Sequence, residues 1–308
     1  MIPRMRAVYH PEREMRRLLL LAVVVLTAAC GRFGNSATSS RQSERVVVIS
    51  QAYTEIIWAL GAQDHVVGVD YSSTWPPEVK SVTTVGYHRA LSAEGILSLR
   101  PTVIVTDGNI GPPQVVEQLK QLNVPFKTFA AKNDSIEGAK ALMREMGAYF
   151  HKEQRAEALC RKLDDDMARA LRDAKQYSDR PRVAVIHYGR ASNIYLLVGA
   201  SGSGDAGAAG QMVRWAGGEM AIQQAGMQRM TSPEIVARAN PDVVLMTEFG
   251  YDRLSGSKDK ILELPGVATS SAARTGRVYR VEEHDLMYFG PSTGEGVSKL
   301  VKLIHQTP

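Results

Sequence analysis

The sequence of 308 residues is long enough for two domains of ordinary size. With 44% hydrophobic and 22% charged residues, its composition is that of a folded protein, which excludes a disordered chain and a multi-span membrane protein. The formal net charge of +5 does not indicate a nucleic-acid-binding surface, because residues 1–29 hold five Arg and two Glu and so carry +3 of it. The rest of the chain carries only +2, and we expect no nucleic-acid partner.

The first 29 residues have the pattern of a secretory signal peptide. Arg16 and Arg17 precede an apolar run, residues 18–26, that is too short to span a bilayer, and small residues follow it. Cys30 comes next, and Leu-Thr-Ala-Ala-Cys resembles a bacterial lipoprotein signal, in which the cysteine is acylated and becomes the mature N-terminus. We expect residues 1–29 to be removed and Cys30 to carry a lipid; a plain secretory signal or a membrane anchor is the alternative.

Cysteine usage agrees with export. The chain has two cysteines, and lipidation of Cys30 would leave Cys160 alone, which excludes an internal disulfide scaffold and a cysteine zinc site. Residues 30–44 are rich in Ser, Gly, Asn and Gln, which is typical of a flexible tether. The folded part is therefore expected to begin near Arg45.

Residues 45–150 alternate between strand-like and helical patterns. Expected strands are residues 45–49, 66–69, 101–106 and 124–129, and expected helices are residues 54–60, 91–99 and 113–122. Because the links between them are short, the pattern predicts an N-terminal α/β lobe with a parallel sheet covered on both faces.

One long helix is expected after this lobe. Residues 152–178 contain neither Gly nor Pro, and apolar residues recur every four positions at Leu159, Leu163, Met167 and Leu171. Such a helix would be about 40 Å long and could join two lobes. We assign residues 151–179 to this connecting helix and residues 180–308 to a C-terminal α/β lobe.

The two lobes contain an internal repeat. Ser92-Ala93-Glu94 leads into the strand 101–106, and Ser232-Pro233-Glu234 leads into a similar apolar run after Pro241, so that Glu precedes Pro by seven residues in both copies. These copies are 140 residues apart, and the first strands of the lobes, which begin at Arg45 and Arg182, are 137 apart. The nearly equal offsets predict two similarly built lobes.

Together these features resemble the substrate-binding proteins of bacterial ABC importers in the cobalamin, siderophore and haem group. The segment Val-Gly-Tyr-His-Arg-Ala-Leu-Ser-Ala-Glu-Gly, residues 85–95, is similar to the haem-binding branch, in which this motif supplies a tyrosine ligand to haem iron. Residues 54–57, Leu60-Gly61 and residues 290–293 also resemble that branch. The resemblance implies a periplasmic-binding-protein-like α/β fold: two similar lobes with mostly parallel sheets, joined by a single long α-helix.

It also implies what the protein does. We expect it to bind haem in the cleft between the lobes and to deliver it to an inner-membrane ABC permease with its ATPase, without catalysing a reaction. Haem is then a transported ligand and not a catalytic cofactor. The expected location is the periplasm or the outer face of the cytoplasmic membrane, with a lipid anchor at Cys30, and the expected state is a monomer.

Tyr87 is the expected iron ligand. A phenolate suits ferric iron, but its ordinary pKa near 10 means that iron and nearby cations must stabilise the deprotonated form. Arg89 is such a cation, and it could equally pair with a haem propionate. His88 and His187 are alternative ligands.

Two further sets of residues have expected roles. Arg190 and Arg253 follow strands of the second lobe and could support the ligand or bind a propionate. Glu94 and Glu234 occupy equivalent places in the two copies, and the resemblance implies that they dock the two subunits of the permease. Helix capping is the simpler account of both glutamates.

Other interpretations remain. A ferric siderophore or cobalamin could replace haem, and His88, His187 and His284 could bind zinc or manganese for a metal importer. Residues 202–207 match G-x-G-x-x-G, which would indicate a dinucleotide site, although a loop over the ligand explains them as well. The sequence contains no H-E-x-x-H or Walker motif, and we expect no enzyme.

Overall fold

The computed structural model describes residues 44–189, 194–197, 207–223 and 228–306. The expected signal peptide, Cys30 and Arg190 lie outside these residues, as do residues 202–206 of the glycine-rich segment. Among the described residues no helix has the length and apolar character needed to cross a membrane.

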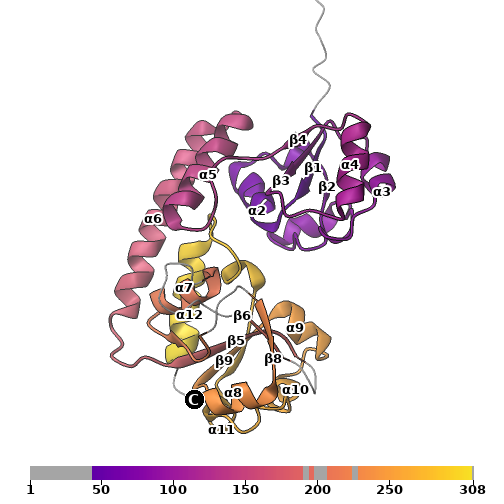
Figure 1. The fold of residues 1–308 in the computed structure, drawn as a ribbon. Helices are drawn as coiled ribbons and strands as arrows, with labels where there is room; N and C mark the ends of the chain where they lie inside the picture. Colours follow the sequence, from indigo (N-terminus) through magenta and orange to yellow (C-terminus); the bar gives the residue numbers. More distant parts are fainter. Residues whose placement is uncertain (1–43, 190–193, 198–206, 224–227, 307–308) are drawn as a thin grey trace, which may run out of the picture. The chain divides into compact units, whose positions relative to one another are not determined.

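The N-terminal lobe contains a four-stranded parallel sheet with the strand order β2-β1-β3-β4 (Figure 1). Its strands are β1 (Val46–Ile49), β2 (Val66–Val69), β3 (Val103–Thr106) and β4 (Phe126–Lys127). Its helices are α2 (Gln51–Leu60), α3 (Ala93–Ser98), α4 (Pro113–Gln121) and α5 (Ile136–Tyr149), with short 3₁₀ turns η1 (Gln63–His65) and η2 (Pro77–Ser81). The strand expected over 124–129 is only two residues long, since Pro125 has no N–H to donate to a ladder.

Both faces of this sheet are buried, as its nearly continuous apolar strands predict. Val46, Val48, Val103 and Val105 pack in one apolar cluster with residues of α2 and α5. The residues between them in the strands pack in a second cluster with α3 and α4. The alternation follows from the two-residue period of a strand.

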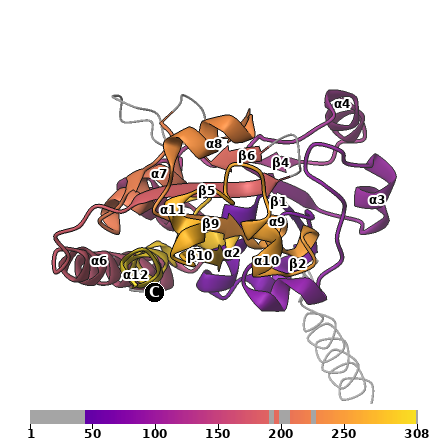
Figure 2. The same cartoon turned by 90° about the horizontal axis from the view of Figure 1, so that it is seen from below.

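The long helix α6 (Glu153–Ala174) connects the lobes and confirms the expected single helical link. It ends four residues before the expected position, where Tyr177 and Asp179 turn away to contact His305 of the C-terminal helix. The rings of Tyr177 and His305 are stacked with centroids 4.1 Å apart. Figure 2 shows α6 lying beside the C-terminal helix α12 (Thr293–His305).

The C-terminal lobe is a mixed six-stranded sheet with the order β10-β9-β5-β6-β8, in which β7 also pairs with β5. Its strands are β5 (Arg182–Gly189), β6 (Ile194–Leu197), β7 (Glu219–Met220), β8 (Gln228–Thr231), β9 (Val243–Thr247) and β10 (Val278–Val281). Its other helices are α7 (Ala208–Trp215), α8 (Pro233–Ala239), α9 (Glu248–Arg253), α10 (Lys258–Leu262), α11 (Ser271–Arg274) and the 3₁₀ turn η3 (Glu283–Asp285). The strands β7, β5, β9 and β10 run parallel, and β6 and β8 add an antiparallel edge.

The strand pairing confirms the internal repeat. Val46 of β1 is opposite Val103 of β3, and Val183 of β5 is opposite Val243 of β9. These four valines are related by the same two offsets that the sequence repeat shows. Each lobe therefore has the same parallel core, and α3 and α8 enter it at equivalent places.

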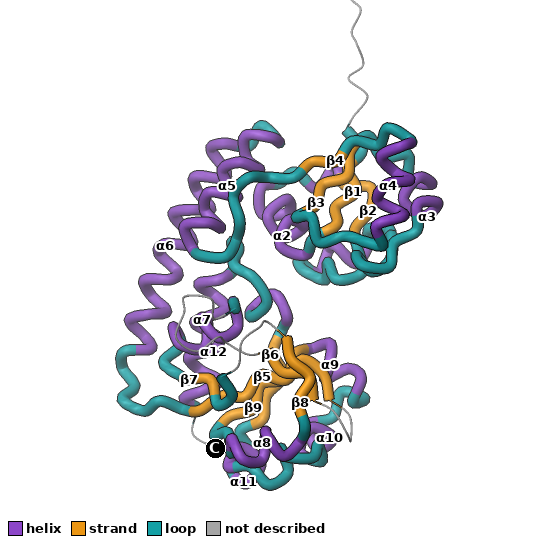
Figure 3. The backbone as a smooth tube through the Cα atoms, viewed as in Figure 1, coloured by secondary structure: helices purple, strands orange, loops and turns teal. Residues whose placement is uncertain are grey.

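One apolar cluster continues from lobe to lobe through α6. Its members include Leu142 of α5, Leu163 of α6 and Leu300 of α12, together with valines of both sheets. Figure 3 shows the helices that carry this cluster and the two sheets as separate sets of strands. Because both lobes bury residues against the same helix, the helix is part of each core.

Candidate ligand-binding cleft

A cavity of about 1980 Å³ is lined by residues of both lobes. This volume exceeds the roughly 300–1,000 Å³ of ordinary small-molecule pockets. The lining residues follow the carboxyl ends of the parallel strands, where open α/β sheets bind ligands. Ser50 follows β1, Asp70 follows β2, Asp107 follows β3, Glu248 follows β9 and Glu282 follows β10.

Tyr87 lines this cavity, and its side chain is 47% exposed. It lies on the loop before α3, just after the pairing of Val69 with Thr84 brings that loop to the edge of the sheet. Gly86 precedes it with a φ of 104°, a conformation that favours glycine. Within the described residues the hydroxyl of Tyr87 has no hydrogen-bond partner, so its oxygen is available to a ligand.

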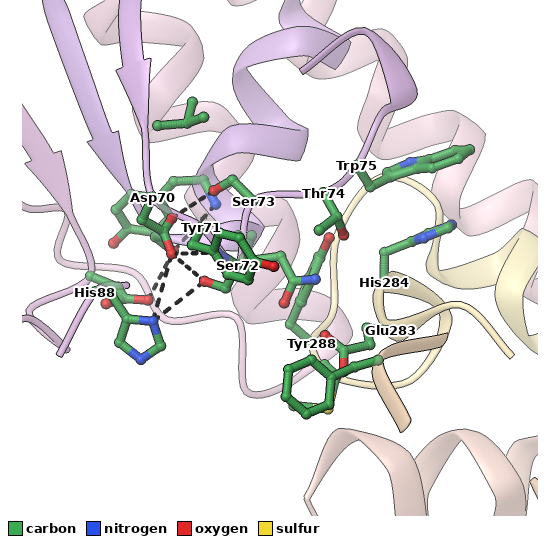
Figure 4. Close-up of a pocket in the computed structure, with 18 of the residues that line it drawn as sticks. Asp70, Tyr71, Ser72, Ser73, Thr74, Trp75, His88, Glu283, His284 and Tyr288 are labelled. Carbon is green, nitrogen blue, oxygen red and sulfur yellow. Dashed lines mark hydrogen bonds and ion pairs between the residues drawn. The ribbon is translucent and has the colours of Figure 1, made fainter. Parts of the chain in front are cut away.

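His88 also lines the cavity, and its imidazole is held by a buried carboxylate. Its Nδ1 lies 3.6 Å from Oδ2 of Asp70 and 3.4 Å from the hydroxyl of Ser72 (Figure 4). Burial acts to raise the pKa of the Asp70 carboxyl, but hydrogen bonds from His88, Ser72 and Ser73 outweigh it and lower that pKa below its ordinary value. A carboxylate that binds Nδ1 is the arrangement that orients metal-ligating histidines, because it leaves Nε2 for the metal.

The rings of Tyr87 and His88 have centroids 4.2 Å apart. Neighbouring side chains this close would approach a planar macrocycle from the same side. If a haem is the ligand, they are therefore expected to be alternatives for one iron and not a pair on opposite faces.

Two expected arginines line the cavity from opposite lobes. Nε of Arg89 donates to Oδ1 of Asn109 at 3.2 Å, and the guanidinium of Arg253 lies 3.5 Å from the ring centroid of Phe249. Both side chains are exposed, and neither has a carboxylate within ion-pair distance in the described part of the chain. An anionic ligand would find both guanidinium groups uncompensated.

His187 follows the expected pattern for the second lobe. It lies near the end of β5 and lines the cavity, with Nδ1 3.0 Å from Oε1 of Glu283 and 3.2 Å from the hydroxyl of Thr247. Its ring is stacked on Phe249 with centroids 4.8 Å apart. Each lobe thus presents one histidine held by an acid, and both histidines remain predictions as ligands.

Glu94 and Glu234 do not line the cavity. Both are exposed and lie in the first turns of α3 and α8, the equivalent helices of the two lobes. Ser92 caps α3 through Gly95, whereas hydrogen bonds from Ser232 and from its own backbone lower the pKa of Glu234. The symmetry that motivates a docking role is therefore present in the tertiary structure, and the role itself stays a prediction.

The floor of the cavity holds His284, one of the alternative metal ligands, together with Trp75 and Tyr288, which the sequence did not single out. Trp75 of the N-terminal lobe stacks on His284 with ring centroids 3.9 Å apart (Figure 4). Burial lowers the pKa of His284 to about 4, so its imidazole is neutral near pH 7. The side chain of Tyr288 is buried beside these residues, and burial raises its pKa well above the ordinary value.

Glu55 joins the two lobes below this floor. Its buried carboxylate accepts a hydrogen bond at 2.9 Å from the backbone N–H of Ser292, at the N-terminus of α12. Burial raises the pKa of Glu55 to about 6 in spite of that bond. Both residues belong to the segments 54–57 and 290–293 that the sequence comparison with the haem-binding branch singled out, and the structure brings these segments into contact.

The alternative metal site finds no support. Within the described residues no three His, Cys, Asp or Glu side chains gather into a group that could hold a metal ion, so His88, His187 and His284 do not form the zinc or manganese site considered above. Of the glycine-rich segment only Gly207 is described, and it lines the cavity at the start of α7. The rest of the segment, on which the dinucleotide alternative rests, lies outside the described residues.

Two lobes with parallel cores, a single helical link and a cavity at the carboxyl ends of both sheets define a binding protein of the periplasmic type. The family model for periplasmic binding proteins matches residues 46–284, and the chain belongs to that family.

The chain is similar to a solved structure, the periplasmic heme-binding protein RhuT from Roseiflexus sp. RS-1 in apo form. The two are 33% identical with a TM-score of 0.76, and the match covers 85% of this chain and 98% of that one. This similarity confirms the two-lobed fold and the resemblance to haem-binding proteins.

Curated relatives are more distant. The uncharacterized ABC transporter substrate-binding lipoprotein YvrC of Bacillus subtilis (strain 168) is 26% identical over 273 residues, which cover 87% of this chain and 82% of that protein. The vitamin B12-binding protein of Pectobacterium carotovorum subsp. carotovorum (strain PC1) is 25% identical over 126 residues, 41% of this chain and 45% of that protein. The match to the vitamin B12-binding protein thus spans less than half of its length.

Proposed function

We propose that this protein captures haem in the cleft between its lobes and delivers it to the permease of an ABC importer. One observation carries the proposal: a tyrosine hydroxyl without a partner among the described residues and two uncompensated guanidinium groups line one cavity. Ferric haem has the matching groups, an iron that takes a phenolate ligand and two propionates that take bidentate arginine. The similarity to a periplasmic haem-binding protein supports the same ligand.

Each of these residues would have its own role in binding haem. Tyr87 binds iron through its oxygen, and loss of its proton is favoured by the iron and by the nearby Arg89. Arg89 and Arg253 pair with propionates, one from each lobe. His88 and His187, each held through Nδ1, are the alternative ligands. The protein itself catalyses no reaction.

The proposed place of action is outside the cytoplasm. The similarity to an ABC transporter substrate-binding lipoprotein supports export and a permease partner with its ATPase. Acylation of Cys30 would hold the protein at a membrane surface, and Glu94 and Glu234 would orient it on the two permease subunits.

Cobalamin is the second candidate ligand, because a part of the chain matches a vitamin B12-binding protein. Cobalamin carries amide side chains where haem carries propionates, and it has no need of two free arginines. The cavity of about 1980 Å³ is large enough for either ligand.

The test is an absorption titration of the purified protein with hemin, with cyanocobalamin in parallel. We expect hemin to bind and to give the charge-transfer bands of a tyrosinate complex. Tyr87→Phe keeps the ring, removes the oxygen ligand and should abolish those bands while lowering affinity. An unchanged spectrum would reject Tyr87 in favour of His88 or His187, and binding of cyanocobalamin without hemin would reject the haem proposal.

A further inference from the structure

Tyr71 presents an aromatic ring at the mouth of the same cleft. Its side chain is 64% exposed, the highest value among the large hydrophobic side chains of the described residues, and it lines the cavity. An exposed aromatic ring leaves apolar surface in contact with water, which is unfavourable. A ring at the mouth of a pocket is well placed to cover an apolar ligand.

The backbone under this ring is firmly held. The N–H of Tyr71 donates to the carbonyl of Gly86 at 2.8 Å, and the preceding Asp70 is almost fully buried. One oxygen of that carboxylate accepts the backbone N–H of Ser72 at 3.0 Å, and the other accepts the hydroxyl of Ser73 at 2.7 Å (Figure 4). The ring is thus displayed on a turn that its neighbours fix, which lowers the entropic cost of using it in binding.

The same contacts connect Tyr71 to the loop of the expected iron ligand. Gly86, whose carbonyl accepts the N–H of Tyr71, directly precedes Tyr87 in the chain. His88 directly follows Tyr87, and its imidazole contacts the carboxylate of Asp70, the residue before Tyr71. Two tyrosines on adjoining segments of one lobe therefore face one cavity. Tyr87 is followed by a histidine, which suits iron, and lies two residues from an arginine, which suits a carboxylate. Tyr71 offers mainly its ring.

We propose that Tyr71 is a specificity-determining residue whose ring packs against the porphyrin macrocycle, while Tyr87 binds the metal. This inference rests on the proposed function, since it names the second contact of the same ligand. It predicts that the contribution of Tyr71 to the binding affinity is the same for a porphyrin with iron and for one without it. A flat aromatic macrocycle gains from the contact, and a ligand without one does not.

The experiment compares hemin with metal-free protoporphyrin IX in fluorescence and absorption titrations. Tyr71→Ala should weaken both ligands by about tenfold, the effect of losing about 50 Å² of apolar contact. Tyr71→Phe should bind both within about twofold of the unaltered protein, because the ring remains. Tyr87→Phe should weaken hemin alone. The control Leu122→Ala removes another exposed apolar side chain, 54% exposed and outside the cavity lining, and should change neither.

The outcomes separate the two proposals. If Tyr71→Ala binds both porphyrins with normal affinity, or loses affinity for hemin alone, the proposed ring contact is wrong. The proposal that the protein captures haem would still stand. A loss in Tyr71→Phe as large as that in Tyr71→Ala would also overturn it, because the hydroxyl and not the ring would then be responsible. If the unaltered protein binds neither porphyrin, the proposed function fails and this inference fails with it.

Discussion

At the scale of single residues, two arginines line the cleft, one from each lobe, and neither has an ion-pair partner in the described part of the chain. A guanidinium paired with a propionate should contribute about 1.5 kcal/mol or more, which corresponds to about tenfold in affinity. We expect Arg89→Ala and Arg253→Ala each to weaken hemin by about that factor. Isothermal titration of the variants measures it.

The matching ligand control is hemin dimethyl ester, which lacks the propionate charges. Both arginine variants should bind the ester as well as the unaltered protein does. Arg172→Ala, on the exposed face of α6, is the protein control. An equal loss of hemin and of its ester would show that the arginines do not recognise the propionates.

Glu55 makes stability depend on pH. Its folded-state pKa is about 6 against an ordinary 4.5, because burial disfavours the ionised form. Between these values the native state binds more protons than the unfolded state, so the contribution is present in full below pH 4.5 and is lost as the pH rises through 6. The shift corresponds to about 2 kcal/mol.

Glu55→Gln keeps the acceptor for the N–H of Ser292 and removes the titrating group. We expect its free energy of unfolding to fall less between pH 5 and 7 than that of the unaltered protein. Urea denaturation at several pH values measures the difference, and Glu94→Gln, an exposed carboxylate, is the control. Parallel profiles for Glu55→Gln and the unaltered protein would contradict the assignment.

At the scale of elements, α6 belongs to the cores of both lobes. Leu163 lies in the middle of this helix, is fully buried and packs in the cluster that contains residues of both sheets. Leu163→Ala should therefore cost about 2–5 kcal/mol, through lost transfer energy and a residual cavity. Chemical denaturation followed by circular dichroism measures the loss, again with Arg172→Ala as the control.

We also expect the denaturation curve to show a single unfolding transition. Because one core continues through α6, both lobes should unfold in a single step, and the substitution should shift the whole transition. Two separated transitions, only one of them shifted, would show that the lobes are independent in spite of the shared helix.

At the scale of the whole molecule, Glu94 and Glu234 lie on equivalent helices of two equivalent lobes. A permease with two subunits could present the same cations to both. The double reversal Glu94→Lys with Glu234→Lys should leave hemin titration unchanged and abolish stimulation of the ATPase in reconstituted membranes, because rim charges chiefly orient a complex. Surviving stimulation would leave helix capping as the account of both glutamates.

The sequence by itself determined the two-lobed architecture and indicated part of the candidate site. Periodicity placed β1, β2 and β3 of the N-terminal lobe and β5 and β9 of the C-terminal lobe, because a buried strand or an amphipathic helix has a pattern that neighbouring residues alone express. The offsets of 137 and 140 residues reappear as equivalent strand pairs, Val46 with Val103 and Val183 with Val243. The motif around Tyr87 could be found because its residues are contiguous, and three of them, Tyr87, His88 and Arg89, line the cavity.

Only the tertiary structure decided which distant residues meet in the cleft and beside it. Glu55 meets Ser292 across 237 residues, His187 meets Glu283, and Trp75 meets His284. No local pattern encodes these pairs, because the two members of each pair lie on elements that are far apart in the sequence and meet only when the chain folds. The ends of parallel strands gather the loops that follow them at one edge of each sheet, whatever their separation in sequence. Burial there sets the pKa of Glu55 and His284, which neither residue's neighbours in the chain reveal.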